Sequence, residues 1–177
     1  EKKILVAVLN REQNHLKMNR YDAATGSFEA TLFEENSDTY IQPLHPVIFN
    51  KDGSGFVWQS RRDGYNHLYL YENSGKLVKQ LTKGNWEVTD CIGYSDAGDR
   101  ICFTANMESP INRDIYTVTI KGGSVKRISS GAGVHKALVN SSAEYFIDEL
   151  SAPGVPRTIS IVNAKGQMEK QLLAAPD

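Results

Sequence analysis

The chain has 177 residues, of which 40% are apolar and 23% charged, and its formal net charge is −1. This composition is typical of a folded globular protein and argues against a disordered chain. A net charge so close to zero gives no general attraction to nucleic acid or anionic membranes, and no run of 18 apolar residues is present that could cross a bilayer as a helix.

The first 45 residues are predicted to form an incomplete unit of three strands, read from alternating apolar residues and turn-forming residues. The expected strands are Ile4–Leu9, Leu16–Tyr21 and Phe28–Phe33. Ile4–Leu9 is too short for the apolar core of a signal peptide and lacks a small-residue cleavage site, so a strand is the simpler interpretation. Because the later units have four strands, the innermost strand of this unit is expected to precede residue 1.

Three units of four strands each are predicted to follow. The strands of the second unit are Pro46–Phe49, Phe56–Gln59, His67–Tyr71 and Leu77–Leu81. Those of the third are Ile92–Tyr94, Ile101–Thr104, Asp114–Ile120 and Ser124–Ile128. Those of the fourth are Ala137–Asn140, Tyr145–Leu150, Arg157–Val162 and Gln167–Leu173.

One sequence motif recurs at a fixed interval in these three units. Phe49, Tyr94 and Val139 each precede a polar turn and another apolar strand, and they lie 45 residues apart. A repeat of about 40–50 residues made only of strands is the size of one β-propeller blade. The predicted fold is therefore all-β: a β-propeller fragment of about four blades of four-stranded antiparallel meanders, with the first blade incomplete. The blades are expected at residues 1–45, 46–89, 90–136 and 137–177.

An open slice of a propeller leaves one apolar sheet face uncovered at each end. The isolated slice is therefore expected to pair with another copy, to exchange strands, or to close into a distorted small ring.

No catalytic, cofactor-binding or metal-binding residue is expected in the chain. The nucleophile pentapeptide Gly-x-Ser-x-Gly is missing, and Ser54 and Ser130 lie in predicted turns. The phosphate-binding glycine patterns are also missing. The histidines do not have the spacing of metal ligands; they are His15, His45, His67 and His135.

Three groups of residues allow a functional interpretation beside a structural one. The adjacent carboxylates Glu34 and Glu35 could bind a cation, but a solvated strand end is favoured. Cys91 and Cys102 flank one predicted turn, and two small buried side chains are favoured over a disulfide because hairpin neighbours rarely have suitable geometry. Several aromatic residues could stack on carbohydrate or peptide, although core packing is favoured: Trp58, Tyr65, Tyr69, Tyr71, Trp86 and Phe103.

Four segments, in chain order, resemble one enzyme family. They are Leu9–Asn14, Trp58–Tyr71, Gln80–Val88, and Thr104–Pro110 together with Asp114–Tyr116. Together they are similar to the N-terminal propeller of dipeptidyl-peptidase-IV-like serine peptidases of the prolyl oligopeptidase superfamily, in its bacterial form. The resemblance covers nearly the whole chain.

The resemblance implies a parent enzyme with an eight-bladed propeller and a C-terminal α/β-hydrolase domain that carries Ser, Asp and His. Such enzymes remove X-Pro or X-Ala dipeptides from peptide N-termini, and many are homodimers. Their propeller limits access to the active site and holds the substrate amino group with a Glu pair. An exported parent, periplasmic or at the cell surface, is expected from the family alone.

The chain departs from this pattern in two ways. The triad and the hydrolase domain are absent, because the sequence stops at Ala174–Asp177, about where that domain would begin. The family's Glu pair lies in a Tyr-Glu-Glu context that does not occur here, so its role is not assigned to Glu34 and Glu35. The Tyr40–Pro46 connection lies where relatives project a loop towards the substrate cavity, but its local match assigns no residue.

The expected function is that of a non-catalytic propeller portion that gates a serine exopeptidase. The alternative is a non-catalytic propeller that binds proteins or ligands. A third possibility, a glycan-binding propeller, would require Trp58 and Trp86 to be exposed.

Overall fold

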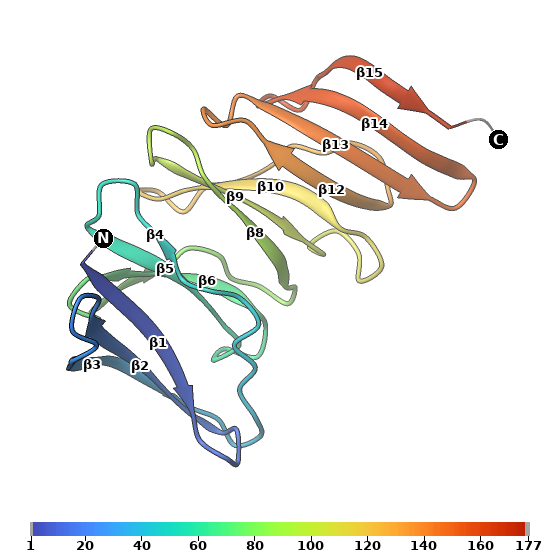
Figure 1. Ribbon diagram of the computed structural model, residues 1–177. Helices are drawn as coiled ribbons and strands as arrows, with labels where there is room; N and C mark the ends of the chain where they lie inside the picture. Colours follow the sequence, from blue (N-terminus) through green and yellow to red (C-terminus); the bar gives the residue numbers. More distant parts are fainter. Residues whose placement is uncertain (1, 176–177) are drawn as a thin grey trace. The chain divides into compact units, whose positions relative to one another are not determined.

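A computed structural model describes residues 2–175. Every regular secondary-structure element in that range is a β-strand (Figure 1). They form one three-stranded and three four-stranded antiparallel sheets, each a meander of consecutive strands. The bounds are β1 (Lys3–Leu9), β2 (His15–Asp22), β3 (Phe28–Asn36), β4 (Ile48–Phe49), β5 (Gly55–Ser60), β6 (His67–Glu72), β7 (Leu77–Gln80), β8 (Val88–Tyr94), β9 (Arg100–Ala105), β10 (Asp114–Thr119), β11 (Val125–Arg127), β12 (Val134–Val139), β13 (Tyr145–Ala152), β14 (Val155–Asn163) and β15 (Met168–Ala174).

The chain divides into two compact units. Residues 1–80 hold the sheets β1–β3 and β4–β7, and the residues from 81 onward hold β8–β11 and β12–β15. The all-β prediction with repeated antiparallel meanders is confirmed. In the described residues no helix is long or apolar enough to cross a membrane.

The turn between the first two strands of each four-stranded sheet is built in the same way. The first turn residue donates its backbone N–H to the carbonyl five residues later at 2.9–3.0 Å; the pairs are Asn50–Gly55, Ser95–Arg100 and Asn140–Tyr145. The fourth position has a positive φ of 69° at Gly53, 67° at Gly98 and 56° at Ala143. The interval of 45 residues in the sequence is therefore a repeat of identical backbone geometry.

The core of the first unit lies between its two sheets. Leu16 and Met18 of β2 are buried against four aromatic residues of β5 and β6, namely Phe56, Trp58, Tyr69 and Tyr71. The rings of Phe56 and Tyr71 stack with centroids 5.4 Å apart. Burying several aromatic side chains contributes much apolar area for few residues, which suits sheets as small as these.

The core of the second unit is built by the same rule from smaller side chains. Cys102, Ile115 and Ile128 pack against Ala143, Phe146 and Val162 of the last sheet. In both units, therefore, one face of a sheet is covered by the next sheet in the chain.

Gly75 lies in the turn between β6 and β7, where this turn packs closely against the first sheet. We therefore expect Gly75→Ala to lower the free energy of unfolding by at least about 2 kcal/mol. Its φ is +87°, and an added Cβ would lie 2.1 Å from the backbone oxygen of Leu32. The matched control is Gly26→Ala, because Gly26 also has a positive φ but nothing lies within 4 Å of its added Cβ. That variant should lose only about 1 kcal/mol. Equal losses in urea unfolding would contradict the close contact.

Candidate functional site

A buried carboxylate joins the two sheets of the first unit. Glu35, near the end of β3, accepts a hydrogen bond from Trp58 Nε1 at 2.9 Å and one from Ser60 Oγ at 2.9 Å. Arg62 Nη2 donates to the same carboxylate and forms an ion pair with it. Only 8% of the Glu35 side chain is exposed, so its charge depends on these donors.

The Arg62 guanidinium is held on its other side by aromatic rings. It lies 4.4 Å from the centre of the Tyr69 ring and 5.7 Å from that of Tyr71. Burial works against its charge, but Glu35 and Tyr71 raise the pKa of Arg62 above its usual value. Burial also raises the pKa of Tyr69, whose hydroxyl donates to Asp63 at 2.6 Å. The three donors and the burial of the carboxylate indicate that this cluster is a structural contact between the two sheets.

Glu34 and Glu35 do not form a paired carboxylate site. Neighbouring residues of a strand point to opposite faces, and Glu34 lies on the exposed side, where His15 Nε2 is 2.6 Å and Lys17 Nζ 3.6 Å from its carboxylate. The hydrogen bond from His15 lowers the pKa of Glu34. The interpretation as a solvated strand end describes Glu34 but is wrong for Glu35, which is buried.

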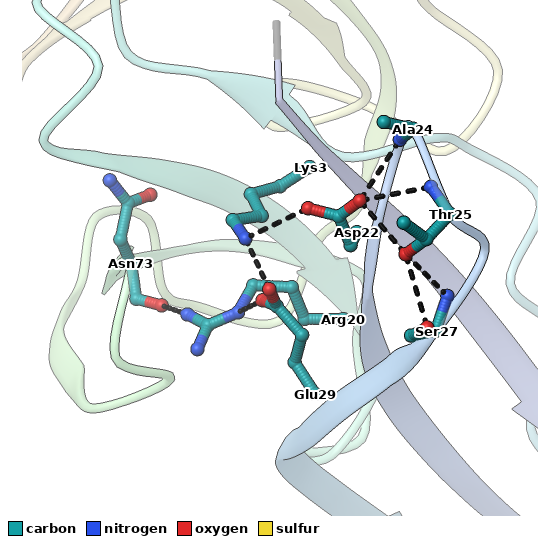
Figure 2. Close-up of polar contacts among 8 residues, drawn as sticks. All are labelled: Lys3, Arg20, Asp22, Ala24, Thr25, Ser27, Glu29 and Asn73. Atoms are coloured by element: carbon teal, nitrogen blue, oxygen red, sulfur yellow. Dashed lines mark hydrogen bonds and ion pairs between the residues drawn. The ribbon is translucent and has the colours of Figure 1, made fainter.

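A second ion-pair network lies at the other end of the first sheet (Figure 2). Lys3 pairs with Glu29 and lies 3.5 Å from Asp22, while Arg20 Nε donates to Glu29 at 2.9 Å. Arg20 also donates to the backbone carbonyl of Asn73 at 2.9 Å, which ties this sheet to the β6–β7 turn. Each carboxylate shown has a cationic partner, so we interpret the network as a structural contact.

The connection from β3 to β4 presents the most exposed large apolar side chains among the described residues of the first unit. Ile41 and Val47 pack on the core of that unit, and the Ile41 N–H donates to the carbonyl of Gln13 at 2.6 Å. Between these anchors Tyr40 is 60% and Leu44 70% exposed. The segment is thus fixed to the core and turns two large apolar groups outward, which makes it the candidate contact surface of the chain.

His135 belongs to a buried polar cluster in the second unit. Its Nδ1 lies 2.8 Å from Asp148 and its Nε2 3.8 Å from Asp114, and Arg127 lies 2.5 Å from the same Asp114 oxygen. Ser129 donates its hydroxyl to that oxygen at 3.0 Å. Arg127 pairs with the buried Asp114 carboxylate. Among the described residues no group of three or more His, Cys, Asp or Glu side chains could hold a metal ion.

The two tryptophans do not form a stacking platform. Trp58 is only 2% exposed, and Trp86 is partly buried, with its ring 6.4 Å from that of Phe103 and nearly parallel to it. A glycan-binding propeller would require both to be exposed, so this possibility is not supported.

The two cysteines are free thiols, with Cys102 buried and Cys91 partly exposed. Burial raises the pKa of Cys91 to about 12 and that of Cys102 to about 11. Because the thiolate is the reactive form, alkylation by iodoacetamide at about pH 8 should be at least ~100-fold slower in the folded chain than in urea. Mass spectrometry of quenched samples measures both sites, and rapid native alkylation would contradict the raised pKa values of the two thiols.

The architecture defines a repeat domain built from antiparallel β-sheets. The family model of the dipeptidyl peptidase IV N-terminal region matches residues 1–157. The chain therefore belongs to the family of dipeptidyl peptidase IV N-terminal regions.

Individual relatives agree with this membership. A solved structure of Porphyromonas gingivalis dipeptidyl peptidase 4 is 28% identical, with a TM-score of 0.87 over 98% of this chain and 24% of its own. A Bacteroides ovatus protein named for dipeptidyl aminopeptidase IV is 31% identical, with a TM-score of 0.91 over 100% of this chain and 28% of its own. Mouse inactive dipeptidyl peptidase 10 is 31% identical over 67% of this chain and 16% of its own length. The chain thus spans between 16% and 28% of the length of these relatives.

Proposed function

We propose that this chain is the propeller portion of a serine exopeptidase that removes N-terminal X-Pro or X-Ala dipeptides. The family match over residues 1–157 is the observation that carries the proposal. In this account the nucleophile and its partners lie in a C-terminal α/β-hydrolase domain, and the sheets described here limit which peptides reach it. A homodimeric, exported parent acting on peptides is part of the same proposal.

The exposed connection between β3 and β4 supports the gating role. Tyr40 and Leu44 are outward-facing apolar groups on a segment that Ile41 and Val47 fix to the core. A fixed apolar surface can contact an extended peptide without being ordered first, which lowers the entropic cost of binding.

The experiment uses the full-length protein that contains this chain and a Gly-Pro chromogenic substrate. We expect turnover by the full-length protein and none by residues 1–177 alone. Replacing Tyr40 and Leu44 together by alanine should raise KM by up to about tenfold, the equivalent of roughly 1.4 kcal/mol of lost contact. The control is Ile111→Ala, because Ile111 is 81% exposed but lies in the β9–β10 connection. An unchanged KM in the double variant would refute the gating role.

A second candidate is a non-catalytic propeller that binds proteins or ligands. It is favoured by one observation, namely that relatives from mouse and rat that are 31% and 32% identical are named as inactive. A full-length protein that is folded but does not cleave the chromogenic substrate would support this second candidate.

A further inference from the structure

The turn between β5 and β6 is held in place by its polar side chains. Arg62 forms an ion pair with Glu35 of β3, and Asp63 accepts a hydrogen bond of 2.6 Å from a tyrosine hydroxyl of β6. At the end of the turn, Asn66 donates at 2.9 Å to a buried glutamine amide of β5. The turn is therefore fixed to both of its own strands and to the sheet β1–β3.

Tyr65 differs from these neighbours because its side chain faces outward. It is 37% exposed, and in the described part of the chain no residue forms a hydrogen bond or a ring contact with it. Gly64, directly before it, has a φ of +94°, a conformation that glycine adopts readily. A tyrosine on a fixed turn offers a large contact area at a low entropic cost, because the backbone and most of the side chain are ordered before a partner binds.

This turn lies at the same end of the first unit as the connection between β3 and β4. Glu35, near the end of β3, contacts Ser60 at the end of β5, so the connection leaves the first sheet beside this turn. Because β4 pairs with β5 in antiparallel register, the connection also returns at the end where β5 finishes. Tyr65 thus lies at the end of the sheets that carries the exposed side chains of Tyr40 and Leu44. Sheets of this chain precede and follow sheet β4–β7, so the exposure of Tyr65 does not arise at a face where the chain begins or ends.

We infer that Tyr65 is a specificity-determining residue that packs against apolar or aromatic side chains of a peptide substrate, beyond the dipeptide that is removed. This inference rests on the proposed function. An extended dipeptide spans only about 7 Å, whereas six residues span about 20 Å. A second contact, on a turn separate from the segment of Tyr40 and Leu44, is therefore reached by longer peptides. The aromatic ring supplies the contact by packing on an apolar side chain.

The test measures kcat and KM of the full-length protein that contains this chain. The substrates are the hexapeptides Gly-Pro-Phe-Phe-Lys-Lys and Gly-Pro-Gly-Gly-Lys-Lys, with Gly-Pro-p-nitroanilide as the reference. The unmodified protein should have the higher kcat/KM on the phenylalanine peptide. Tyr65→Ala should reduce this preference by about fivefold to tenfold, mainly through KM, which is the effect of losing one aromatic contact. Tyr65→Phe keeps the ring and should retain the preference within about twofold.

The matched control is Phe28→Ala. Phe28 is also aromatic and is 57% exposed, but it lies at the first residue of β3, at the opposite end of that strand from Glu35. Its replacement should leave the preference between the two hexapeptides unchanged. Circular dichroism of each variant checks folding.

Two results would overturn the inference and leave the proposed function intact. One is an unchanged preference in Tyr65→Ala. The other is an equal fall in kcat/KM on all three substrates, which would indicate that Tyr65 contacts another part of the protein. Failure of the folded, unmodified protein to cleave any of the three substrates would instead refute the proposed function, and this inference with it.

Discussion

Trp58→Ala is expected to lower the free energy of unfolding by about 3–5 kcal/mol, the range for removing a large buried aromatic side chain. Trp58 is 2% exposed and packs with Leu16 and Met18 of the facing sheet. Its loss also removes the indole N–H that donates to the buried carboxylate of Glu35 at 2.9 Å. Urea unfolding followed by far-UV circular dichroism measures the change.

Trp58→Phe separates the two contributions of the side chain. The phenyl ring keeps most of the packing and loses the N–H donor, so about 1–2 kcal/mol should be lost, the value of a hydrogen bond to a charged group together with a smaller ring. A change within error for the alanine variant would show that Trp58 is not part of the core, and equal losses for both variants would show that packing contributes little.

Arg62→Ala is expected to cost about 3 kcal/mol, because it leaves the Glu35 carboxylate buried without its positive partner. The side chain of Arg62 is 27% exposed, which places the effect at the lower end of values for buried pairs. Contact of the guanidinium with the Tyr69 and Tyr71 rings is lost in the same variant. Thermal and urea unfolding measure the loss.

A second substitution tests the reason for this loss. In the Arg62→Ala background, Glu35→Gln removes the unpaired charge and should recover part of the stability. The matched control is Glu34→Gln, because Glu34 is the adjacent carboxylate but is 42% exposed; its effect should stay within about 1 kcal/mol. If Glu35→Gln further destabilised the arginine variant, the buried charge would not be the source of the loss.

The strands were predictable where turn chemistry brackets an apolar run. Phe56–Gln59 was expected and β5 spans Gly55–Ser60, and the Gly53 turn that begins it recurs every 45 residues. The prediction of Pro46–Phe49 was too long, since β4 holds only Ile48–Phe49. Proline has no N–H to contribute to a ladder, and Val47 is used for packing on the core.

The buried cluster around Glu35 was not predicted, although the sequence contains part of the pattern that indicates it. Trp58, Ser60 and Arg62 alternate along one strand and its following turn, so three donors share one side. Their acceptor lies more than 20 residues earlier on another sheet, and nothing local indicates that Glu35 turns inward while Glu34 turns outward. Contacts between sheets depend on packing and register, which periodicity within one strand does not specify.

The most direct test of the central proposal compares two substrates on the full-length protein that contains this chain. One is Gly-Pro-p-nitroanilide with a free amino group, and the other is the same compound with that group acetylated. An exopeptidase that binds a cationic N-terminus and cleaves after the second residue should cleave the substrate with the free amino group. It should leave the acetylated substrate intact. Equal cleavage of both, or cleavage of neither by a folded protein, would contradict the assignment to a dipeptidyl peptidase.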